Sequence, residues 1–333
     1  FYIGIDTSKL TVDIAVLQEN SIISRAKIKN SEQELSAHFR TLKADHKCNN
    51  KNCLICAEDG GLYNTFLCNV CEKRKLNLCI ESALRIKKSL GIQRGKNDAL
   101  DAVRIAGYAS RHYTGLRLWH PVRPVLGQLK SLSVIRERII KARTMLLNSK
   151  KDENHFLPKR KSNDLKKYLM NSGDGMKQDI MQVESEMEKI IEGDGRLKRL
   201  MDIITTVPCI GKVIATEMII TTSEFDPSWT AKTFSSYCGI APFEWTSGES
   251  VRGKAKVSHY ANKNIKRLLH LAALGIVQIR KSCLKNYYER KVAEGKNKMS
   301  ILNAIRNKLV AQVFACVRND SFYKEPILKG DIL

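Results

Sequence analysis

The chain has 333 residues, of which 57 are Lys or Arg and 34 are Asp or Glu, so it carries a formal charge of +23. With 43% hydrophobic residues, 19 Gly and 7 Pro, it can bury a core, which excludes disordered, collagen-like and low-complexity proteins. Its length is typical of two or three domains. The longest apolar stretches, such as 268–277, are shorter than the ~20 residues that cross a bilayer, and no basic-then-apolar leader opens the chain. We therefore expect a cytoplasmic protein, with its ten cysteines as reduced thiols.

The positive charge is concentrated in two blocks. Residues 121–170 and 245–310 are strongly basic, whereas the segment between them, 171–244, is acidic. Solvated lysine faces are common on helical proteins and would account for one such block. Two blocks at this net charge favour a polyanionic partner, and we predict that it is a nucleic acid.

The first third of the chain predicts a mixed α/β sheet. Period-two alternation and short polar breaks indicate consecutive strands at 2–6, 11–17 and 22–28. Ser31 and Glu34 have the spacing of a capping box, so a helix should begin there and end near residue 45. The pattern then predicts a strand, a helix, a strand and a helix, at 53–58, 62–75, 77–82 and 97–112. Three strands followed by alternating helices and strands are typical of a mixed sheet rather than a doubly wound one.

The remainder of the chain is predicted to be mainly helical. Apolar residues at helical spacing in 125–150 and 176–201, with the polar stretch 157–175 between them, predict a long antiparallel helical hairpin, or coiled coil. A compact helical domain should follow over 202–310, interrupted at Pro208, at Asp226-Pro227 and in the segment 239–253.

Four carboxylates have the positions of metal ligands. Asp6 and Glu58 each close a predicted strand, and Gly4 beside Asp6 leaves room for a close approach. Asp98 and Asp101 are three residues apart at the start of a helix, so both point to one side of it. Oxygen ligands of this kind suit a pair of divalent cations in phosphoryl transfer. Each acid alone also fits an ordinary role at a turn or helix start, and the neighbouring acids Asp13 and Asp59 are competing ligands.

Zinc binding is a competing interpretation of the cysteines. Cys53 with Cys56, and Cys68 with Cys71, have the spacing of two ligand pairs. In an extended strand, however, residues three apart project to opposite faces, so Cys53 and Cys56 should not bind one ion. We therefore predict that Cys68 and Cys71 are core positions of a helix.

The ordered acidic motifs resemble a known family. The run from Gly4 to Lys9, then Glu58 with Gly61 and Tyr63, then the run from Lys96 to Ala102, is similar to the DEDD domain of the insertion-sequence-110 family of transposases. These proteins are similar in fold to the RuvC-type Holliday junction resolvases, which have an RNase H-like sheet. The resemblance implies that Asp6, Glu58, Asp98 and Asp101 hold Mg²⁺, as a pair of ions.

A second match lies in the C-terminal part. The run from Ile203 to Lys212 resembles a helix-hairpin-helix turn, in which backbone N–H groups at Gly211 and the Lys212 side chain would meet a DNA phosphate. Cys209 replaces the usual first glycine of that turn. A plain helix–turn–helix packing element is the alternative.

The resemblance also implies a nucleophile. In this family the serine of a Ser-Gly pair attacks DNA, and the matching residue here is Ser247. Basic side chains around it would neutralise the charge that develops on the phosphate, and these are Arg252, Lys254 and Lys256. Downstream, His259 and Ala261 occupy the Lys and Gly places of the family's Ser-Lys-x-Gly-Asn pattern, although Ser258 and Asn262 remain. Lys263, Lys266 and Arg267 would compensate for the missing lysine.

The resemblance covers nearly the whole chain and implies three domains. They are an RNase H-like catalytic domain at 1–115, a helical hairpin at 120–200 and a serine-bearing helical domain at 201–320. The implied activity is that of a transposase that cuts and rejoins donor and target double-stranded DNA, guided by a structured non-coding RNA, as a homodimer or homotetramer. The alternatives are a resolvase-like nuclease that activates water, a site-specific DNA invertase of the same family, and a non-catalytic nucleic-acid-binding protein.

Overall fold

The computed structural model describes residues 1–89, 91, 98–156, 159–247, 251–279 and 282–325, and within these ranges the side chains of 98, 148–168, 245, 247, 251, 252 and 254 are not described. The chain forms two compact units, Phe1–Pro121 and Val122–Leu333. The division into three domains stays a prediction. None of the described helices is long and apolar enough to cross a membrane.

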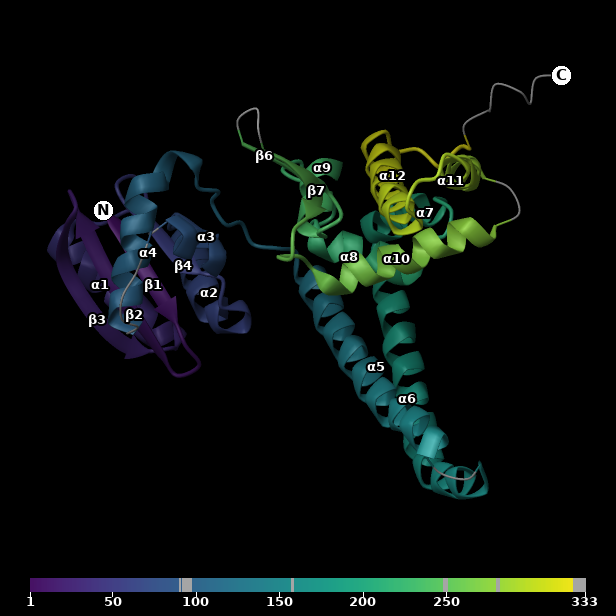
Figure 1. Cartoon of the computed structure of the whole chain (residues 1–333). Coiled ribbons are helices and arrows are strands. Elements are labelled where there is room, and N and C mark those ends of the chain that lie inside the picture. The colour runs from purple at the N-terminus through teal and green to yellow at the C-terminus, as the bar shows by residue number, and fades with distance from the viewer. Residues whose placement is uncertain (90, 92–97, 157–158, 248–250, 280–281, 326–333) are drawn as a thin grey trace. The chain divides into compact units, whose positions relative to one another are not determined.

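The N-terminal unit is built on a mixed five-stranded sheet (Figure 1). Its strands are β1 (Tyr2–Thr7), β2 (Thr11–Gln18), β3 (Ser21–Lys29), β4 (Leu54–Glu58) and β5 (Leu78–Glu81). The order is β3-β2-β1-β4-β5, in which β1, β2 and β3 pair antiparallel and β1, β4 and β5 pair parallel. The predicted mixed sheet is thus confirmed, and this arrangement fits an RNase H-like α/β fold.

Helices cover both faces of the sheet. The helices are α1 (Glu32–His46), α2 (Thr65–Arg74), α3 (Ala83–Ser89) and α4 (Asp98–His112), with short 3-10 turns η1 (Gly61–Asn64) and η2 (Tyr113–Gly115). The N-cap of α1 is Ser31, whose hydroxyl accepts a hydrogen bond from the backbone N–H of Glu34 at 3.3 Å, as its spacing predicts. Apolar side chains of α1 and α2 pack on one face of the sheet, and those of α3 and α4 on the other.

The C-terminal unit contains two long helices and a cluster of shorter ones (Figure 1). The elements are α5 (Pro124–Phe156), α6 (Lys159–Glu192), α7 (Gly195–Thr205), α8 (Lys212–Thr221), α9 (Ala231–Tyr237), α10 (Lys263–Gln278), α11 (Cys283–Ala293) and α12 (Lys298–Arg318). The core of this unit joins residues of α7, α8, α10 and α12 with the ends of α5 and α6 nearest to them.

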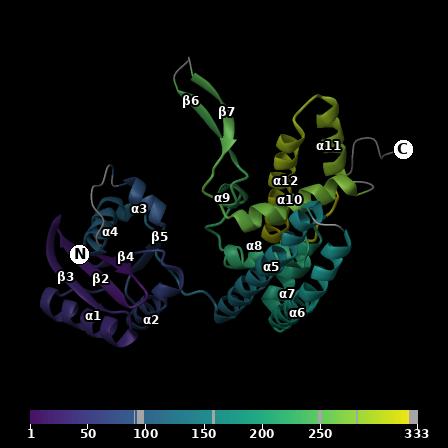
Figure 2. The ribbon, with the colours of Figure 1, turned by 60° about the horizontal axis from the view of Figure 1, so that its bottom comes forward.

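Two features of this unit differ from the sequence-based expectation. The polar stretch 157–175 was expected to separate the two long helices, but α6 begins at Lys159 and runs through it. Helix formation there needs no apolar stripe, because Lys, Arg, Met and Leu have good helix propensity and the helix leaves the core at this end. A β-hairpin of β6 (Pro242–Ser247) and β7 (Val251–Val257) lies in the break of the helical pattern, as Figure 2 shows. Its cue was present, since small or apolar residues alternate with basic ones along β7.

Candidate metal and nucleic-acid sites

A row of carboxylates crosses the N-terminal sheet. The strand register pairs Asp6 of β1 with Asp13 of β2, and Glu58 of β4 with Glu81 of β5. The parallel pair β1–β4 has Ile5 opposite Ala57, so the next position places Asp6 beside Glu58. Paired residues on neighbouring strands point to the same face of a sheet. The four carboxylates therefore lie on one face, with Asp6 and Glu58 at the centre of the row.

Helix α4 lies against that same face. A Cβ added at Gly4 would overlap the carbonyl oxygen of Ala102 and the backbone nitrogen of Ala106, so only glycine allows this approach. Because side chains alternate along a strand, Gly4 and Asp6 share a face. The predicted close approach at Gly4 is thus made by the helix that carries Asp98 and Asp101.

The direction of α4 places its first turn near Asp6. The rings of Tyr2, at the start of β1, and Tyr113, just after α4, have centroids 6.2 Å apart. Helix α4 therefore runs antiparallel to β1, with its middle over Gly4. Two residues of strand span about 6.6 Å, which is about four residues of helix, so Asp6 is level with the beginning of α4. Asp98 and Asp101 belong to that beginning.

The described contacts of the helical acids are few. Asp101 makes an ion pair with Arg104 at 2.6 Å and is partly exposed. Asp98 is the first residue of α4, but its side chain lies outside the described residues, as does the preceding segment 92–97 of the family motif. The structure thus brings Asp6 and Glu58 together by register and carries the backbone of both helical acids to the same end of the sheet face.

The outer members of the row are neutralised by neighbouring side chains. Asp13 is buried and ion-pairs with Lys27 of β3 at 3.4 Å. Glu81 is buried, ion-pairs with Arg85 at 3.0 Å and accepts a hydrogen bond from the hydroxyl of Tyr108 at 3.1 Å. Burial and the nearby Glu81 carboxylate raise the pKa of Tyr108 to about 12, so this hydroxyl remains a donor. Sequence reasoning overlooked Glu81, although it closes a strand as Glu58 does.

Buried Asn64 fixes the ends of the two central strands. Its amide nitrogen donates to the carbonyl oxygen of Glu58 at 2.8 Å, and its amide oxygen accepts from the hydroxyl of Thr7. The competing acid Asp59 is exposed and accepts a hydrogen bond from the backbone N–H of Gly61 at 3.1 Å. These contacts hold the loop after β4 and keep Asp6 and Glu58 adjacent.

The cysteine pairs lie in separate cores. Cys53 and Cys71 belong to the core beneath α1 and α2, whereas Cys56 belongs to the core beneath α4 and pairs in register with Cys79. The two faces of β4 thus separate Cys53 from Cys56, as the geometry of an extended strand requires. Burial raises the pKa of the Cys68 thiol to about 11 and keeps it protonated.

The turn between α7 and α8 contains the predicted helix-hairpin-helix residues. Gly211 is the N-cap of α8, and Cys209 has a left-handed backbone with φ of 61°. A Cβ added at Gly275 of α10 would lie 2.9 Å from the sulfur of Cys209, so this side chain packs on α10. Lys212 makes an ion pair with Glu188 of α6. Lys212 as a DNA contact stays a prediction, and that contact would have to compete with this carboxylate.

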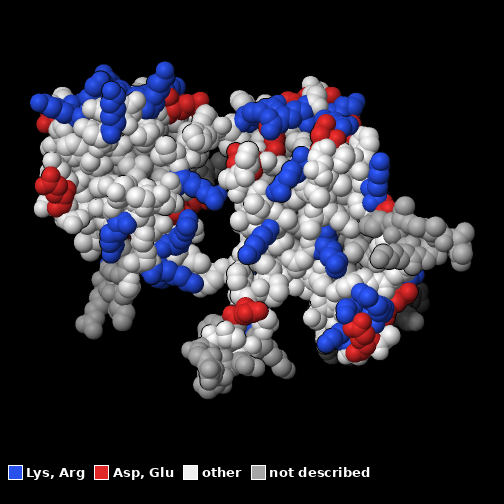
Figure 3. Space-filling model, turned by 90° about the horizontal axis from the view of Figure 1, so that it is seen from above, with Lys and Arg blue, Asp and Glu red and all other residues white. Residues whose placement is uncertain are grey.

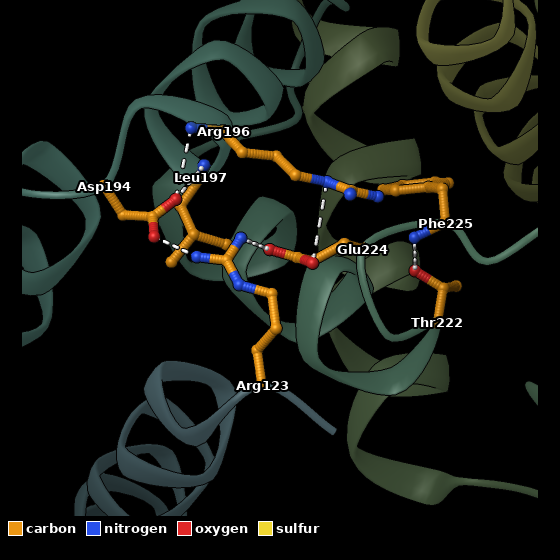
Figure 4. Close-up of polar contacts among 7 residues, drawn as sticks. All are labelled: Arg123, Asp194, Arg196, Leu197, Thr222, Glu224 and Phe225. Atoms are coloured by element: carbon orange, nitrogen blue, oxygen red, sulfur yellow. Dashed lines mark hydrogen bonds and ion pairs between the residues drawn. The ribbon is translucent and has the colours of Figure 1, made fainter. Parts of the chain in front are cut away.

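An ionic network holds α7 and α8 against the start of α5 (Figure 4). Arg123, just before α5, bonds Asp194 on one side and Glu224 on the other, at 2.7 Å to the latter. Asp194 caps α7 by accepting from the backbone N–H groups of Arg196 and Leu197 at 3.1 and 3.0 Å. Glu224 is buried and also lies 3.6 Å from Arg196. Every charge in this network is therefore compensated.

The predicted nucleophile is on the β6–β7 hairpin. Ser247 is the last residue of β6 and pairs with Val251, but the side chains of Ser247, Arg252 and Lys254 lie outside the described residues. Lys256 and Lys263 are exposed, and Arg267 is exposed on α10. Asn262 is the N-cap of α10, and its side chain accepts from the backbone N–H of Ile265 at 3.1 Å. Basic side chains also extend over other parts of the surface, as Figure 3 shows for one face.

Comparisons with known proteins identify the family. A family model described as Transposase matches residues 3–152, and one described as Transposase IS116/IS110/IS902 family matches residues 201–289. The pilin gene-inverting proteins of Moraxella bovis and Moraxella lacunata are each 24% identical over 96% of this chain and 96% of their own. An insertion element IS110 protein of Streptomyces coelicolor is 27% identical over 39% of this chain and 32% of its own. The structure of Thermus thermophilus RuvC with a Holliday junction substrate is 11% identical, covers 35% of this chain and 98% of its own, and has a TM-score of 0.26.

The N-terminal sheet with its carboxylates and the C-terminal match together define a DNA-recombining enzyme. The chain belongs to the IS110 family of transposases. It is therefore an enzyme that cuts DNA strands and transfers them, its substrate is DNA, and its DEDD domain implies dependence on divalent metal ions.

Proposed function

We propose that this transposase breaks and rejoins phosphodiesters with Ser247 as the nucleophile and with Mg²⁺ held by Asp6, Glu58, Asp98 and Asp101. The observation that carries the proposal is the carboxylate row beneath α4. Register places Asp6 beside Glu58, and the antiparallel course of α4 brings the backbone of Asp98 and Asp101 level with them. The backbones of these four residues thus lie at one end of the sheet face, although among the described side chains no three Asp, Glu, His or Cys residues are grouped closely enough to hold a metal ion.

The donor set fits a hard divalent cation. All four proposed ligands are carboxylates, and Asp6, Glu58 and Asp101 are each only partly buried, so water and phosphate can reach them. Asp13 and Glu81, the outer acids of the row, are buried and ion-pair with Lys27 and Arg85. When bound, a pair of such ions would stabilise the charge that develops on the attacking and leaving oxygens.

The serine step would proceed by direct displacement at phosphorus. The Ser247 hydroxyl loses its proton and its oxygen forms a bond to the scissile phosphate, while the bond from phosphorus to a deoxyribose oxygen breaks. That oxygen leaves as a hydroxyl after it takes up a proton. The reverse displacement, by a hydroxyl of another strand, would release Ser247 and join the DNA. Arg252, Lys254 and Lys256 all belong to β7, the strand that pairs with β6, and we expect their charges to neutralise the phosphate.

The partners that we propose are donor and target double-stranded DNA and a structured guide RNA. The C-terminal unit offers basic surface for both, including Lys256, Lys263 and Arg267, and Gly211 with Lys212 at the α7–α8 turn. A homodimer or homotetramer would allow the serine of one copy to serve the acids of another. Sequencing the RNA that copurifies with the full chain tests the guide directly, since a single abundant structured RNA is expected.

Trapping a covalent complex with DNA tests the serine. Wild-type protein with Mg²⁺ and a DNA substrate should give a protein–DNA adduct that survives denaturation, and Ser247→Ala should reduce it at least about a thousand-fold. Ser258→Ala is the matched control, because Ser258 belongs to the same basic region. Asp6→Asn should abolish the adduct but leave DNA affinity within about two-fold. Strand cleavage without any adduct in wild-type protein would instead indicate a water-activating nuclease of the resolvase type.

Site-specific inversion is a second candidate function, because both relatives that align over 96% of this chain are named pilin gene-inverting proteins. An inverting enzyme would act on two sites in opposite orientation in one DNA molecule. A plasmid with candidate sites in inverted orientation, compared with separate donor and target plasmids, distinguishes inversion from transposition by the products that form.

A further inference from the structure

A basic pocket lies in the C-terminal unit between β7, the start of α10 and α12. Its volume is about 1050 Å³, and the cations that line it are Lys256, Lys263, Lys266, Arg267 and Arg306. No carboxylate is among the residues that line it in the described part of the chain. Such a surface attracts anions, because the positive charges are uncompensated and the low-dielectric walls concentrate their field.

Arg306 distinguishes this pocket from an ordinary basic surface. Its residue is only 7% exposed, although it lines the pocket, and its Nε is buried without a hydrogen-bond partner among the described residues. Burial lowers the pKa of this guanidinium, and the Nδ1 of His270 on the same pocket wall is also buried without a partner in the described part of the chain. An unpaired buried cation destabilises the fold, so a role outside folding would account for its presence.

The pocket wall is held by contacts that do not involve these cations. The amide nitrogens of Asn303 and Asn307 on α12 both donate to the carbonyl oxygen of Ile240, at 2.8 and 2.9 Å. Ile240 lies just before β6, so these bonds tie the base of the hairpin to α12. The guanidinium of Arg306 therefore belongs to a wall that is formed before any ligand binds, which reduces the entropy lost on binding.

An exposed aromatic ring stands beside the cations. Phe243 of β6 is 50% exposed and is the cross-strand partner of Lys256. Cross-strand partners share a face, so the ring is next to the pocket-lining lysine. A ring beside a row of cations is the arrangement that binds unpaired nucleic acid, since a base stacks on the ring while phosphates meet the charges. Bases within a duplex are stacked on each other and are not available for this contact.

We propose that this pocket binds an unpaired nucleic-acid strand, with Arg306 bonding one phosphate at the floor and the four other cations bonding the neighbouring phosphates. The inference rests on the proposed function and specifies the form of nucleic acid that this part of the enzyme holds. Arg306 is suited to this contact because its guanidinium can donate two hydrogen bonds to one phosphate.

The test compares two arginines of the same helix. The full chain is titrated against a single-stranded DNA of about 16 nucleotides, against RNA of the same sequence and against the DNA duplex, and binding is followed by fluorescence anisotropy. Arg306→Met should weaken single-strand binding roughly ten-fold and lower the slope of log affinity against log salt by about one. Arg318→Met is the matched control, because Arg318 is exposed at the end of α12, and it should change affinity less than about two-fold.

Further measurements keep the test decisive. Lys266→Met removes a charge from the pocket rim and should weaken the same binding several-fold, whether or not Arg306→Met folds. The DNA and RNA strands reveal which source supplies the phosphate, and a larger loss of affinity in Arg306→Met for either one than for the duplex supports the proposal. Equal affinity of Arg306→Met and wild type for the single strands, or a loss on the duplex as large as the loss on the single strands, overturns it. Inorganic phosphate that raises the Tm of wild type but not of Arg306→Met, without single-strand binding, would show a small-anion site and also overturn it.

The same titrations distinguish a failure of the pocket proposal from a failure of the proposed function. A wild-type chain that binds neither duplex nor single strands contradicts the proposed recombinase itself. A wild-type chain that binds DNA and forms the Ser247 adduct, with Arg306→Met indistinguishable from it in single-strand affinity, contradicts only the role of the pocket.

Discussion

Two arginines of the C-terminal unit lie in opposite electrostatic surroundings. Arg123 is bonded on both sides, to Asp194 and to the buried carboxylate of Glu224. Arg306 is nine-tenths buried, yet its Nε has no hydrogen-bond partner within the described residues, and no carboxylate lines its pocket there. One guanidinium completes a network of the folded chain, whereas the other leaves a charge that the described chain does not compensate.

This difference teaches how to separate charges that stabilise the fold from charges that bind a ligand. Removing one member of a buried ionic network leaves the other members unpaired, which is strongly destabilising. Removing a buried cation that has no partner takes away a desolvation cost instead. The same substitution, arginine to methionine, should therefore have opposite effects on the free energy of unfolding at the two positions.

The largest effect is expected at Arg123. Arg123→Met should lower the free energy of unfolding by roughly 3 kcal/mol, because among the described residues Glu224 would remain buried with only the more distant Arg196 to compensate it. Chemical denaturation of the full chain measures this change. Arg306→Met should leave the free energy unchanged or raise it. If Arg306→Met lowered the free energy of unfolding as much as Arg123→Met does, the two arginines would not differ in their contribution to the fold.

A smaller effect is expected at Asp194, which both caps α7 and pairs with Arg123. Asp194→Ala should cost about 1 to 2 kcal/mol of stability at neutral pH. Asp194→Asn should cost less, because an asparagine oxygen still accepts the bonds from the backbone N–H groups of Arg196 and Leu197. Thermal or chemical unfolding of both variants ranks them, and equal losses would show that the cap contributes little.

The pH dependence of the same residue has a definite sign. The backbone N–H of Leu197, with Arg123, holds the pKa of the Asp194 carboxyl below its ordinary value. A depressed carboxyl pKa contributes stability that is complete above the unfolded pKa of about 3.9 and is lost as the pH falls through the folded pKa. Wild type should therefore lose more stability than Asp194→Asn as the pH falls from about 4 towards 2. Parallel pH profiles for the two proteins would contradict this assignment.

The smallest effect is expected at His270. Burial, together with the charge of Arg306, lowers the pKa of its imidazole. A depressed histidine pKa contributes stability above the unfolded pKa of about 6.5, and this is lost as the pH falls through the folded pKa. Arg306→Met should raise the His270 pKa towards its ordinary value, as an NMR titration of the imidazole would show. An unchanged pKa would mean that the Arg306 charge is already compensated.

Local sequence patterns were sufficient for much of the N-terminal unit. Alternation of side chains predicted the strands, and the spacing of Ser31 and Glu34 predicted the start of α1. Both patterns follow from geometry within a few residues, which does not depend on the rest of the chain. The same reasoning failed where local preference and context diverge. It placed the break between the two long helices over 157–175, whereas α6 already begins at Lys159, and it left the β6–β7 hairpin unassigned.

The candidate sites divide in the same way. The sequence by itself determined the family, the excess of positive charge and the identity of the acids, because these depend on which residues are present and in what order. Only the tertiary structure decided that Asp6 and Glu58 are neighbours and that Lys27 and Arg85 neutralise Asp13 and Glu81. It also decided that the Nε of Arg306 is buried without a partner among the described residues, while Arg123 has two carboxylate partners. Strand register and helix packing bring together residues that are tens of positions apart, and no local pattern records which charges then face each other.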